Sequence, residues 1–192
     1  RFLKSKRKSQ IYKIIYAGNL GEGQDILSLI KNINENKKLL KKFNEYKISF
    51  DIYGSGSQLK EINKLLSQDC FSDKINYCGL VPRNNIHKIY EEADCLMLHL
   101  ANYLSLSLVI PSKIFEYTAT PFPIIYSANG FTRNFIEKIE GTIYFKQGCF
   151  KSFLNSINIS KEIKINYKER SKFLEKYSQE KIIKKYVNHI LN

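Results

Sequence analysis

Three side chains in one short stretch could bind a phosphorylated ligand. IPSKIFEY (110–117) places a hydroxyl, an ammonium and a carboxylate, those of Ser112, Lys113 and Glu116, directly after Pro111. Proline is favoured in the first turn of a helix, so a helix is expected to begin there. Helix N-terminal amides attract anions, and a lysine among them opposes the helix dipole unless an anion is present. We therefore expect Ser112 and Lys113 beside a phosphate and Glu116 beside ligand hydroxyls; the simpler alternative is that Lys113 extends into solvent.

Glycine-rich turns elsewhere point to the same kind of ligand. AGNLGEGQD (17–25) and YGSGSQ (53–58) each follow an apolar run and precede a helical pattern. Glycine lets the backbone approach a ligand closely and adopt positive φ angles. Neither turn has G-x-G-x-x-G spacing, and no G-K-[ST] follows any glycine, which excludes a P-loop. One such turn alone is more often structural, but together they predict a crevice for a phosphorylated ligand.

Several other kinds of catalytic site are excluded. The sequence contains no H-E-x-x-H and no G-x-S-x-G, which removes the usual metallohydrolases and serine hydrolases. The four cysteines, Cys70, Cys78, Cys95 and Cys149, show no C-x-x-C spacing, so we expect reduced core residues and no metal site. His99, near the end of an apolar run, is either a site residue or, more simply, a buried core histidine.

The candidate residues need strands and helices that bring them together. Six short runs rich in β-branched and aromatic residues predict strands, at 11–18, 48–54, 75–80, 95–100, 123–127 and 141–145. The stretch 25–43 predicts an amphipathic helix, and two or three helices are expected after residue 145. This alternation predicts an α/β fold, a Rossmann-like doubly wound parallel sheet with C-terminal helices. Ligands bind such a sheet beyond the carboxyl ends of its strands, where the candidate residues lie.

Length and charge limit the remaining choices. The 192 residues suit a single domain, 1–192, and a hydrophobic share of 43% predicts a folded chain. A formal net charge of +13 suggests contact with phosphates, nucleic acid or an anionic membrane, although solvated helix faces explain it as well. Nucleic-acid binding would need a clustered basic face with exposed aromatics and is not expected. No apolar run is long enough to predict a membrane span.

Four segments in order resemble a known family. They are IIYAGNLGEGQDI, DIYGSGSQLKEI, INYCGLVPRNNIHKIYEEADCLMLHL and IPSKIFEYTATPFPII. Together they resemble the C-terminal, donor-binding domain of retaining GT-B-fold glycosyltransferases of family four (group 1), which build bacterial surface polysaccharides. The resemblance runs from about residue 11 to the end, because RSKFLEKYSQEKIIKKYVNHIL is similar to the family's helical tail. It implies retaining transfer of a hexose or N-acetylhexosamine from a nucleotide sugar, a UDP-sugar being expected, without a further cofactor.

The resemblance also implies roles for individual residues. Lys113 and Glu116 become the catalytic candidates, with Lys113 stabilising the departing diphosphate. Glu116 matches the second glutamate of an E-x7-E motif and is expected to hold the ribose hydroxyls. The turn at 18–21 would lie under the diphosphate, and the loop 80–83 would flank the base. The donor-binding candidates are Gly18, Asn19, Gly21, Gly54, Leu80, Val81, Arg83 and Ser112.

Two positions depart from the family's pattern. Leu108 stands where the first glutamate of E-x7-E would lie, so a donor-sugar contact from that position is not available. Similar sequences with P-S-K-x-x-E also lack this glutamate, so we interpret it as a subgroup feature. In TATPFP (118–123), Pro121 and Phe122 replace the usual glycine and lysine, which predicts a different helix stop.

The resemblance further implies half of an enzyme. The acceptor would be bound mainly by an N-terminal domain, absent from this sequence, so the isolated chain is expected to be inactive. Expected partners are the nucleotide-sugar donor, that N-terminal domain and a lipid-linked or glycan acceptor, in the cytoplasm. A further hypothesis places the lysine-rich terminal helices on the inner face of the membrane. The alternatives are a non-catalytic nucleotide-binding regulatory or scaffolding module, and an NAD-type dehydrogenase domain, which the glycine pattern and the missing ribose-binding acid disfavour.

Overall fold

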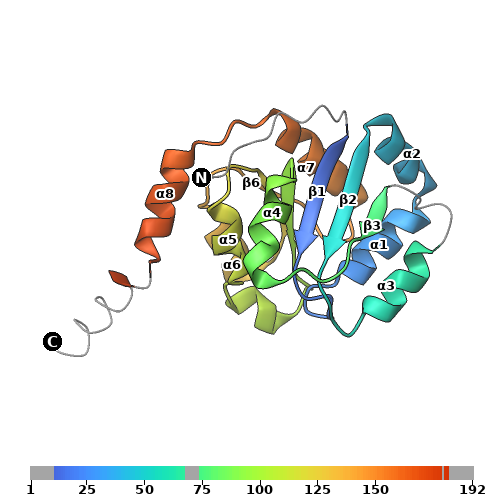
Figure 1. Cartoon of the computed structure of the whole chain (residues 1–192), viewed down its shortest axis with the longest axis horizontal. Coiled ribbons are helices and arrows are strands. Elements are labelled where there is room, and N and C mark those ends of the chain that lie inside the picture. Colours follow the sequence, from blue (N-terminus) through green and yellow to red (C-terminus); the bar gives the residue numbers. More distant parts are fainter. Residues whose placement is uncertain (1–10, 68–73, 179, 182–192) are drawn as a thin grey trace.

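A six-stranded parallel sheet forms the centre of the molecule (Figure 1). The computed structural model describes residues 11–67, 74–178 and 180–181. The strands are arranged in the order β3-β2-β1-β4-β5-β6, and every neighbouring pair is parallel. The predicted Rossmann-like sheet is therefore confirmed. Its strands are β1 (Tyr12–Ala17), β2 (Ile48–Tyr53), β3 (Ile75–Tyr77), β4 (Cys95–His99), β5 (Ile124–Ser127) and β6 (Thr142–Tyr144).

The order of the strands reverses beside β1. The chain runs outward from β1 to β3 and then returns to place β4 beside β1, which makes the β1–β4 boundary the point where the strand order reverses. In sheets of this kind, that reversal opens a crevice at the carboxyl ends of the strands.

Helices cover both faces of the sheet. The helices are α1 (Ile26–Glu35), α2 (Lys37–Glu45), α3 (Leu59–Leu66), α4 (Ile86–Glu91), α5 (Lys113–Thr118), α6 (Gly130–Ile136), α7 (Phe150–Glu162) and α8 (Tyr167–Lys176), with 3-10 helices η2 (Arg83–Asn85) and η3 (Leu104–Leu108).

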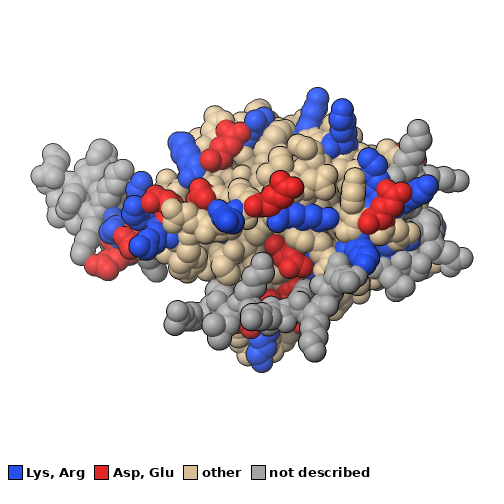
Figure 2. Space-filling model, turned by 90° about the horizontal axis from the view of Figure 1, so that it is seen from above, with Lys and Arg blue, Asp and Glu red and all other residues tan. Residues whose placement is uncertain are grey.

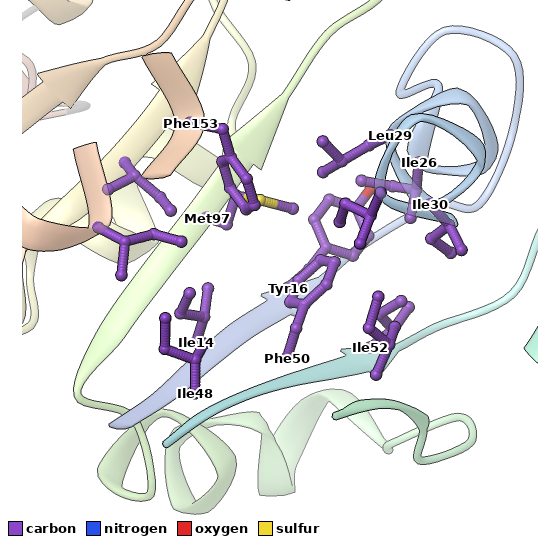
Figure 3. Close-up of a cluster of buried hydrophobic side chains, with 14 of the residues drawn as sticks. Ile14, Tyr16, Ile26, Leu29, Ile30, Ile48, Phe50, Ile52, Met97 and Phe153 are labelled. Atoms are coloured by element: carbon purple, nitrogen blue, oxygen red, sulfur yellow. The ribbon is translucent and has the colours of Figure 1, made fainter. Parts of the chain in front are cut away.

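Two hydrophobic clusters lie on opposite faces of the sheet. On one face, side chains of β1, β2 and β4 pack against α1 and α7; Ile14, Phe50 and Phe153 are among them (Figure 3). On the other face, Ile15 and Tyr126 pack against α4, α5, α6 and α8. Successive residues of a strand point to opposite faces, so both neighbours Ile14 and Ile15 are fully buried. This burial on both faces explains why the strand sequences are mostly apolar, with few polar residues such as Asp51 among them.

The predicted helix over 25–43 is in fact two helices. Asn36 leaves helical geometry, with φ −106° and ψ 82°, and separates α1 from α2. Ile33 at the end of α1 and Phe43 on α2 are both fully buried in one cluster. A straight helix would turn two positions ten residues apart about 80° away from one another. The break therefore allows both side chains to reach the core.

A fully buried arginine fixes the C-terminal helix α8 to the sheet. The guanidinium of Arg170 donates hydrogen bonds to the carbonyl oxygens of Thr120 (2.7 Å), Phe122 (2.7 Å), Glu140 (2.7 Å) and Gly141 (3.4 Å). Burial lowers the pKa of Arg170 to about 10, which leaves the group charged at neutral pH. These bonds join α8 to the loops before β5 and before β6. The sequence had not indicated this residue.

The unusual TATPFP segment ends α5 without a left-handed residue. The hydroxyl of Thr120 donates to the carbonyl of Tyr117 at 2.7 Å and satisfies one of the free carbonyls at the helix end. Phe122 follows as a buried core side chain. The predicted difference in helix stop is thus accounted for by a threonine cap and an apolar anchor.

The free cysteines differ in burial. Cys95 is a core residue, but Cys78 is exposed, so the prediction of a core position was wrong for Cys78; Cys70 lies outside the described residues.

The described surface has mixed charge: Lys and Arg are interspersed with Asp and Glu on the side seen in Figure 2. No helix in the described ranges combines the length and the apolarity needed to cross a membrane. The lysine-rich segment after residue 181 also falls outside the description.

Candidate functional site

A cavity of about 550 Å³ lies at the carboxyl edge of the sheet, the lower edge in Figure 1. It is open to the ends of β1 and β2 and to the start of α5. Ala17, Tyr53, Ser55 and Ile86 form part of its wall. Gly21 is buried nearby but does not line it. The cavity brings together the other sequence-predicted candidates, Gly18, Asn19, Gly54, Leu80, Val81, Arg83, Ser112, Lys113 and Glu116.

The register of β1 and β2 places the two glycine turns side by side. The strands pair from Tyr12 with Ile48 to Ala17 with Tyr53, so they end together. Gly54 has φ +132°, and a Cβ at this position would collide with the carbonyl oxygen of Gly18. Gly54 is therefore required for the close packing of one turn on the other, a structural role that the sequence alone had left open.

Several amides of these turns are already hydrogen-bonded. The N–H of Gly18 donates to Tyr53 O at 3.0 Å, and that of Leu20 donates to Ser55 O at 2.8 Å. Within the described residues, the N–H groups of Asn19 and Ser55 have no backbone partner, and both residues line the cavity. Fewer amides are therefore free to bind an anion than the glycine pattern suggested, and those of Asn19 and Ser55 are available.

Lys113 and Glu116 form an ion pair on the wall of the cavity. Lys113 Nζ lies 2.8 Å from Glu116 Oε2, and both side chains are about one third exposed, at 31% and 36%. Tyr90 Oη donates to the same carboxylate oxygen at 3.1 Å and accepts from Lys113 at 3.3 Å. The cation therefore already has an anionic partner, so its position does not by itself require a bound phosphate. Both of these bonds go to Oε2, and no described group hydrogen-bonds Glu116 Oε1, so Oε1 is available to a ligand hydroxyl.

Two tyrosines in edge-to-face contact connect this ion pair to the end of β1. Tyr117 Oη accepts from the N–H of Ala17 at 3.2 Å, and its ring meets that of Tyr90 edge to face at 5.4 Å. Burial raises the pKa of both phenols, so each stays a neutral hydroxyl. Tyr90 was missed in the sequence, although Ile86, Ile89 and Tyr90 recur at helical spacing and predict the inward face of α4.

The outer wall of the cavity is apolar with one cation. Leu80 is 71% exposed, and Val81 and Ile86 are partly buried beside it. Arg83 begins the short helix η2 and is exposed. An apolar surface next to a guanidinium is suited to an aromatic ring that carries polar edges.

The start of α5 differs slightly from the expectation. The helix begins at Lys113 with Ser112 at the N-cap, so Pro111 lies before the cap rather than in the first turn. Ser112 makes no capping hydrogen bond through its side chain. Ser112 therefore keeps its hydroxyl at the cavity wall, while α5 has only six residues and contributes a weak dipole.

Leu108 lies in an exposed segment beside the site. The position is 64% exposed at the end of η3, and its leucine side chain has no carboxylate to offer. The hydroxyl of Thr132 on α6 donates to the carbonyls of Leu106 (2.8 Å) and Val109 (2.5 Å) and holds the segment in place. Any hydrogen bonds to a ligand on this side must come from other residues.

His99 is buried, as the simpler interpretation expected. Its Nδ1 lies 2.7 Å from the carbonyl oxygen of Gln24, and its ring stacks on Phe145 at 5.9 Å. Burial lowers the pKa of His99, so the ring is neutral at physiological pH. The ring also lines a second cavity of about 290 Å³ that shares Ser112 and Lys113 with the first. In the described part of the chain, no three His, Cys, Asp or Glu residues cluster as metal ligands would.

Solved structures share the fold. The lipopolysaccharide outer core galactosyltransferase WaaB superposes with a TM-score of 0.68 at 16% identity, over 96% of this chain and 50% of WaaB. TarM, from S. aureus, gives 0.69 at 18% identity, over 95% of this chain and 36% of TarM. Anabaena HepE, solved with UDP and glucose, gives 0.60 at 13% identity, over 91% of this chain and 43% of HepE. The chain thus spans half or less of each of these proteins and corresponds to one Rossmann-like half of a GT-B fold.

Sequence comparison identifies the family. No curated protein matches the chain significantly. The sequence profile described as "Glycosyl transferases group 1", however, matches residues 2–185, which is nearly the whole chain. Together with the doubly wound parallel sheet, this match shows that the chain belongs to the group 1 glycosyl transferases.

Proposed function

We propose that the chain is the donor-binding half of a retaining glycosyltransferase and that its donor is a nucleoside-diphosphate sugar. The 550 Å³ cavity carries this proposal, because it combines an apolar shelf, a carboxylate and a lysine in one place. HepE and a TarM mutant were solved with UDP, which supports a UDP-sugar as the donor. The acceptor-binding half would be a separate N-terminal domain.

The cavity suggests an order for the parts of the donor. The base would lie on Leu80 and Val81, and the ribose hydroxyls would donate to Glu116. The diphosphate would then extend towards the Asn19 amide, Ser112 and Lys113. Lys113, now paired with Glu116, would turn towards the phosphate. Glu116 Oε2 would keep its hydrogen bond from Tyr90, while Oε1 accepts a hydrogen bond from a ribose hydroxyl.

The residues present would assist departure of the diphosphate. As the bond from the anomeric carbon to the phosphate oxygen breaks, negative charge grows on the leaving group. The Asn19 amide and Lys113, once Lys113 has turned towards the bound phosphate, would stabilise this charge electrostatically. Lys113 is therefore the candidate for leaving-group stabilisation, and Glu116 acts by binding and orienting the ribose.

The biological setting is also a proposal. WaaB is described as a lipopolysaccharide outer core galactosyltransferase, which supports a hexosyl or N-acetylhexosaminyl transfer in bacterial surface polysaccharide synthesis. Such a reaction would take place in the cytoplasm on a glycan or lipid-linked acceptor, with peripheral contact at the inner face of the membrane.

Calorimetry with UDP, GDP, dTDP and their sugars tests the proposal on the chain itself. Nucleotides of one base should bind. The Lys113→Ala substitution should weaken the binding of the nucleoside diphosphate about tenfold and leave the affinity for the nucleoside unchanged. Lys172→Ala on α8, an exposed lysine remote from the cavity, is the matched control. Absence of binding by every nucleotide would refute the proposal. Binding without turnover in a full-length enzyme would favour the scaffolding alternative.

A further inference from the structure

Three cavities follow one another at the carboxyl edge, and their charge changes along the series. The first, of 550 Å³, has Arg83, Lys113 and Glu116 in its wall. The second, of 290 Å³, shares Lys113 with the first and reaches His99. The third, of about 320 Å³, shares His99 with the second, and no charged side chain of the described residues lines it. The third cavity is thus chemically unlike the nucleotide site beside it.

Uncharged polar side chains from three elements converge on the third cavity. Ser28 and Asn32 lie four residues apart and so share one face of α1. Neither side chain has a hydrogen-bonding partner among the residues described. Asn102 follows β4, and its Oδ1 accepts from Asn129 at 2.7 Å, which leaves its own amide hydrogens for a ligand. These groups are hydrogen-bond donors and acceptors that carry no charge.

His99 adds an acceptor between the second and third cavities. A carbonyl oxygen can only accept, so the proton must be on Nδ1, which faces Gln24 O at 2.7 Å. The neutral ring then has a lone pair on Nε2, for which the described chain supplies no donor. An acceptor of this kind is complementary to a hydroxyl group and not to a phosphate.

Gln147 adds a second unused acceptor. Its Nε2 donates to the carboxylate of Asp25 at 3.0 Å, which fixes the orientation of the amide because a carboxylate only accepts. Its Oε1 is buried and has no partner within the described residues. Such an atom is unfavourable until a donor reaches it. Oε1 is covered in this conformation, so a hydroxyl would reach it after a small turn about the soft terminal torsion of the side chain.

We propose that this third cavity is a subsite for an uncharged sugar ring, read by Ser28, Asn32, His99, Asn102 and Gln147. The inference rests on the proposed function, since it assigns the sugar of that reaction to residues of this chain. A site that hydrogen-bonds hydroxyls through buried polar groups rejects ligands that lack them. It would also supply the sugar contacts that Leu108 cannot make. The ring is either the donor's transferred sugar or the terminal sugar of the acceptor.

Two binding measurements on the chain distinguish these sources. Calorimetry compares UDP with UDP-glucose, UDP-galactose and UDP-N-acetylglucosamine. Saturation-transfer NMR tests methyl glycosides of the same sugars, with and without UDP. Asn32→Ala and Asn102→Ala should each weaken sugar binding about fivefold, the worth of one neutral hydrogen bond, without changing the affinity for UDP. The same substitution at an exposed position on α3, Asn63→Ala, is the control.

Each outcome has a definite meaning. A fivefold loss confined to the nucleotide sugars supports the donor sugar, and a loss confined to the methyl glycosides supports the acceptor sugar. Sugar binding that both variants leave intact overturns the inference, as does the absence of any sugar contribution in either assay. If UDP fails to bind, the proposed function fails, but the methyl glycosides still test the subsite.

Discussion

Arg170→Met is the perturbation that most clearly tests how the fold supports the site. The substitution introduces an unbranched, apolar side chain that replaces most of the arginine stem but removes all of the guanidinium donors. In the structure these donors satisfy four backbone carbonyls around the starts of β5 and β6. The side chain is 0% exposed, so little water can replace the lost donors.

The expected loss of stability is large for a single substitution. Each buried carbonyl left without a donor costs about 1–3 kcal/mol, but relaxation and loss of the charge's own desolvation penalty offset part of the sum. We expect a decrease of about 4 kcal/mol in the free energy of unfolding, out of a total of about 5–15 kcal/mol for a domain. For a chain of this length that corresponds to a melting temperature roughly 10 °C lower.

Urea and thermal unfolding followed by circular dichroism measure this loss. Arg170→Lys should fall between the wild type and Arg170→Met, because an ammonium retains the charge but cannot span the same carbonyls. Lys172→Met, on the same helix but exposed, should unfold as the wild type does. An Arg170→Met protein with a wild-type midpoint would refute the role given to this residue.

Three further predictions concern the turn, the histidine and the cysteines. Gly54→Ala should destabilise the chain by several kcal/mol and abolish nucleotide binding, since its Cβ would meet the backbone of Gly18; a normal urea midpoint would contradict this. As pH falls through 6.5, the unfolded chain binds a proton at His99 that the folded chain does not, so stability should decline by up to about 1.4 kcal/mol per pH unit; the decline should be smaller in His99→Gln by urea titration at pH 5 and 7. Peptide mapping by mass spectrometry, after iodoacetamide treatment of the folded chain, should find Cys78 alkylated and Cys95 intact, because Cys78 is exposed whereas Cys95 is buried and burial raises its pKa to about 12; labelling of both at one rate would contradict this.

The central strands were predictable because most of their residues are buried on both faces. A strand covered by helices on both sides is mostly apolar, and the run 95–98 shows this directly. The polar exceptions in β2, Ser49 and Asp51, are hydrogen-bonded to one another. The break at Asn36 was not predictable, because both halves carry helical periodicity and only the packing of Phe43 decides between one helix and two.

The sequence could predict most residues that line the candidate site, but not the hydrogen bonds among them. Strand topology gathers the ends of β1, β2 and β3 with α5, whatever the side chains do there. The Lys113–Glu116 pair could have been inferred from its i, i+3 spacing. Arg170 was harder to find, although it shares a helical stripe with Phe173 and Tyr177, three and seven residues on. A cation at a core position of an amphipathic pattern is the signal that could have indicated it.

A structure of the chain determined with UDP tests the central claim most directly. The account predicts UDP in the 550 Å³ cavity, with a ribose hydroxyl within hydrogen-bonding distance of Glu116 and the diphosphate beside Asn19 and Lys113. UDP bound at another surface, or bound in the cavity with its ribose away from Glu116, would contradict it.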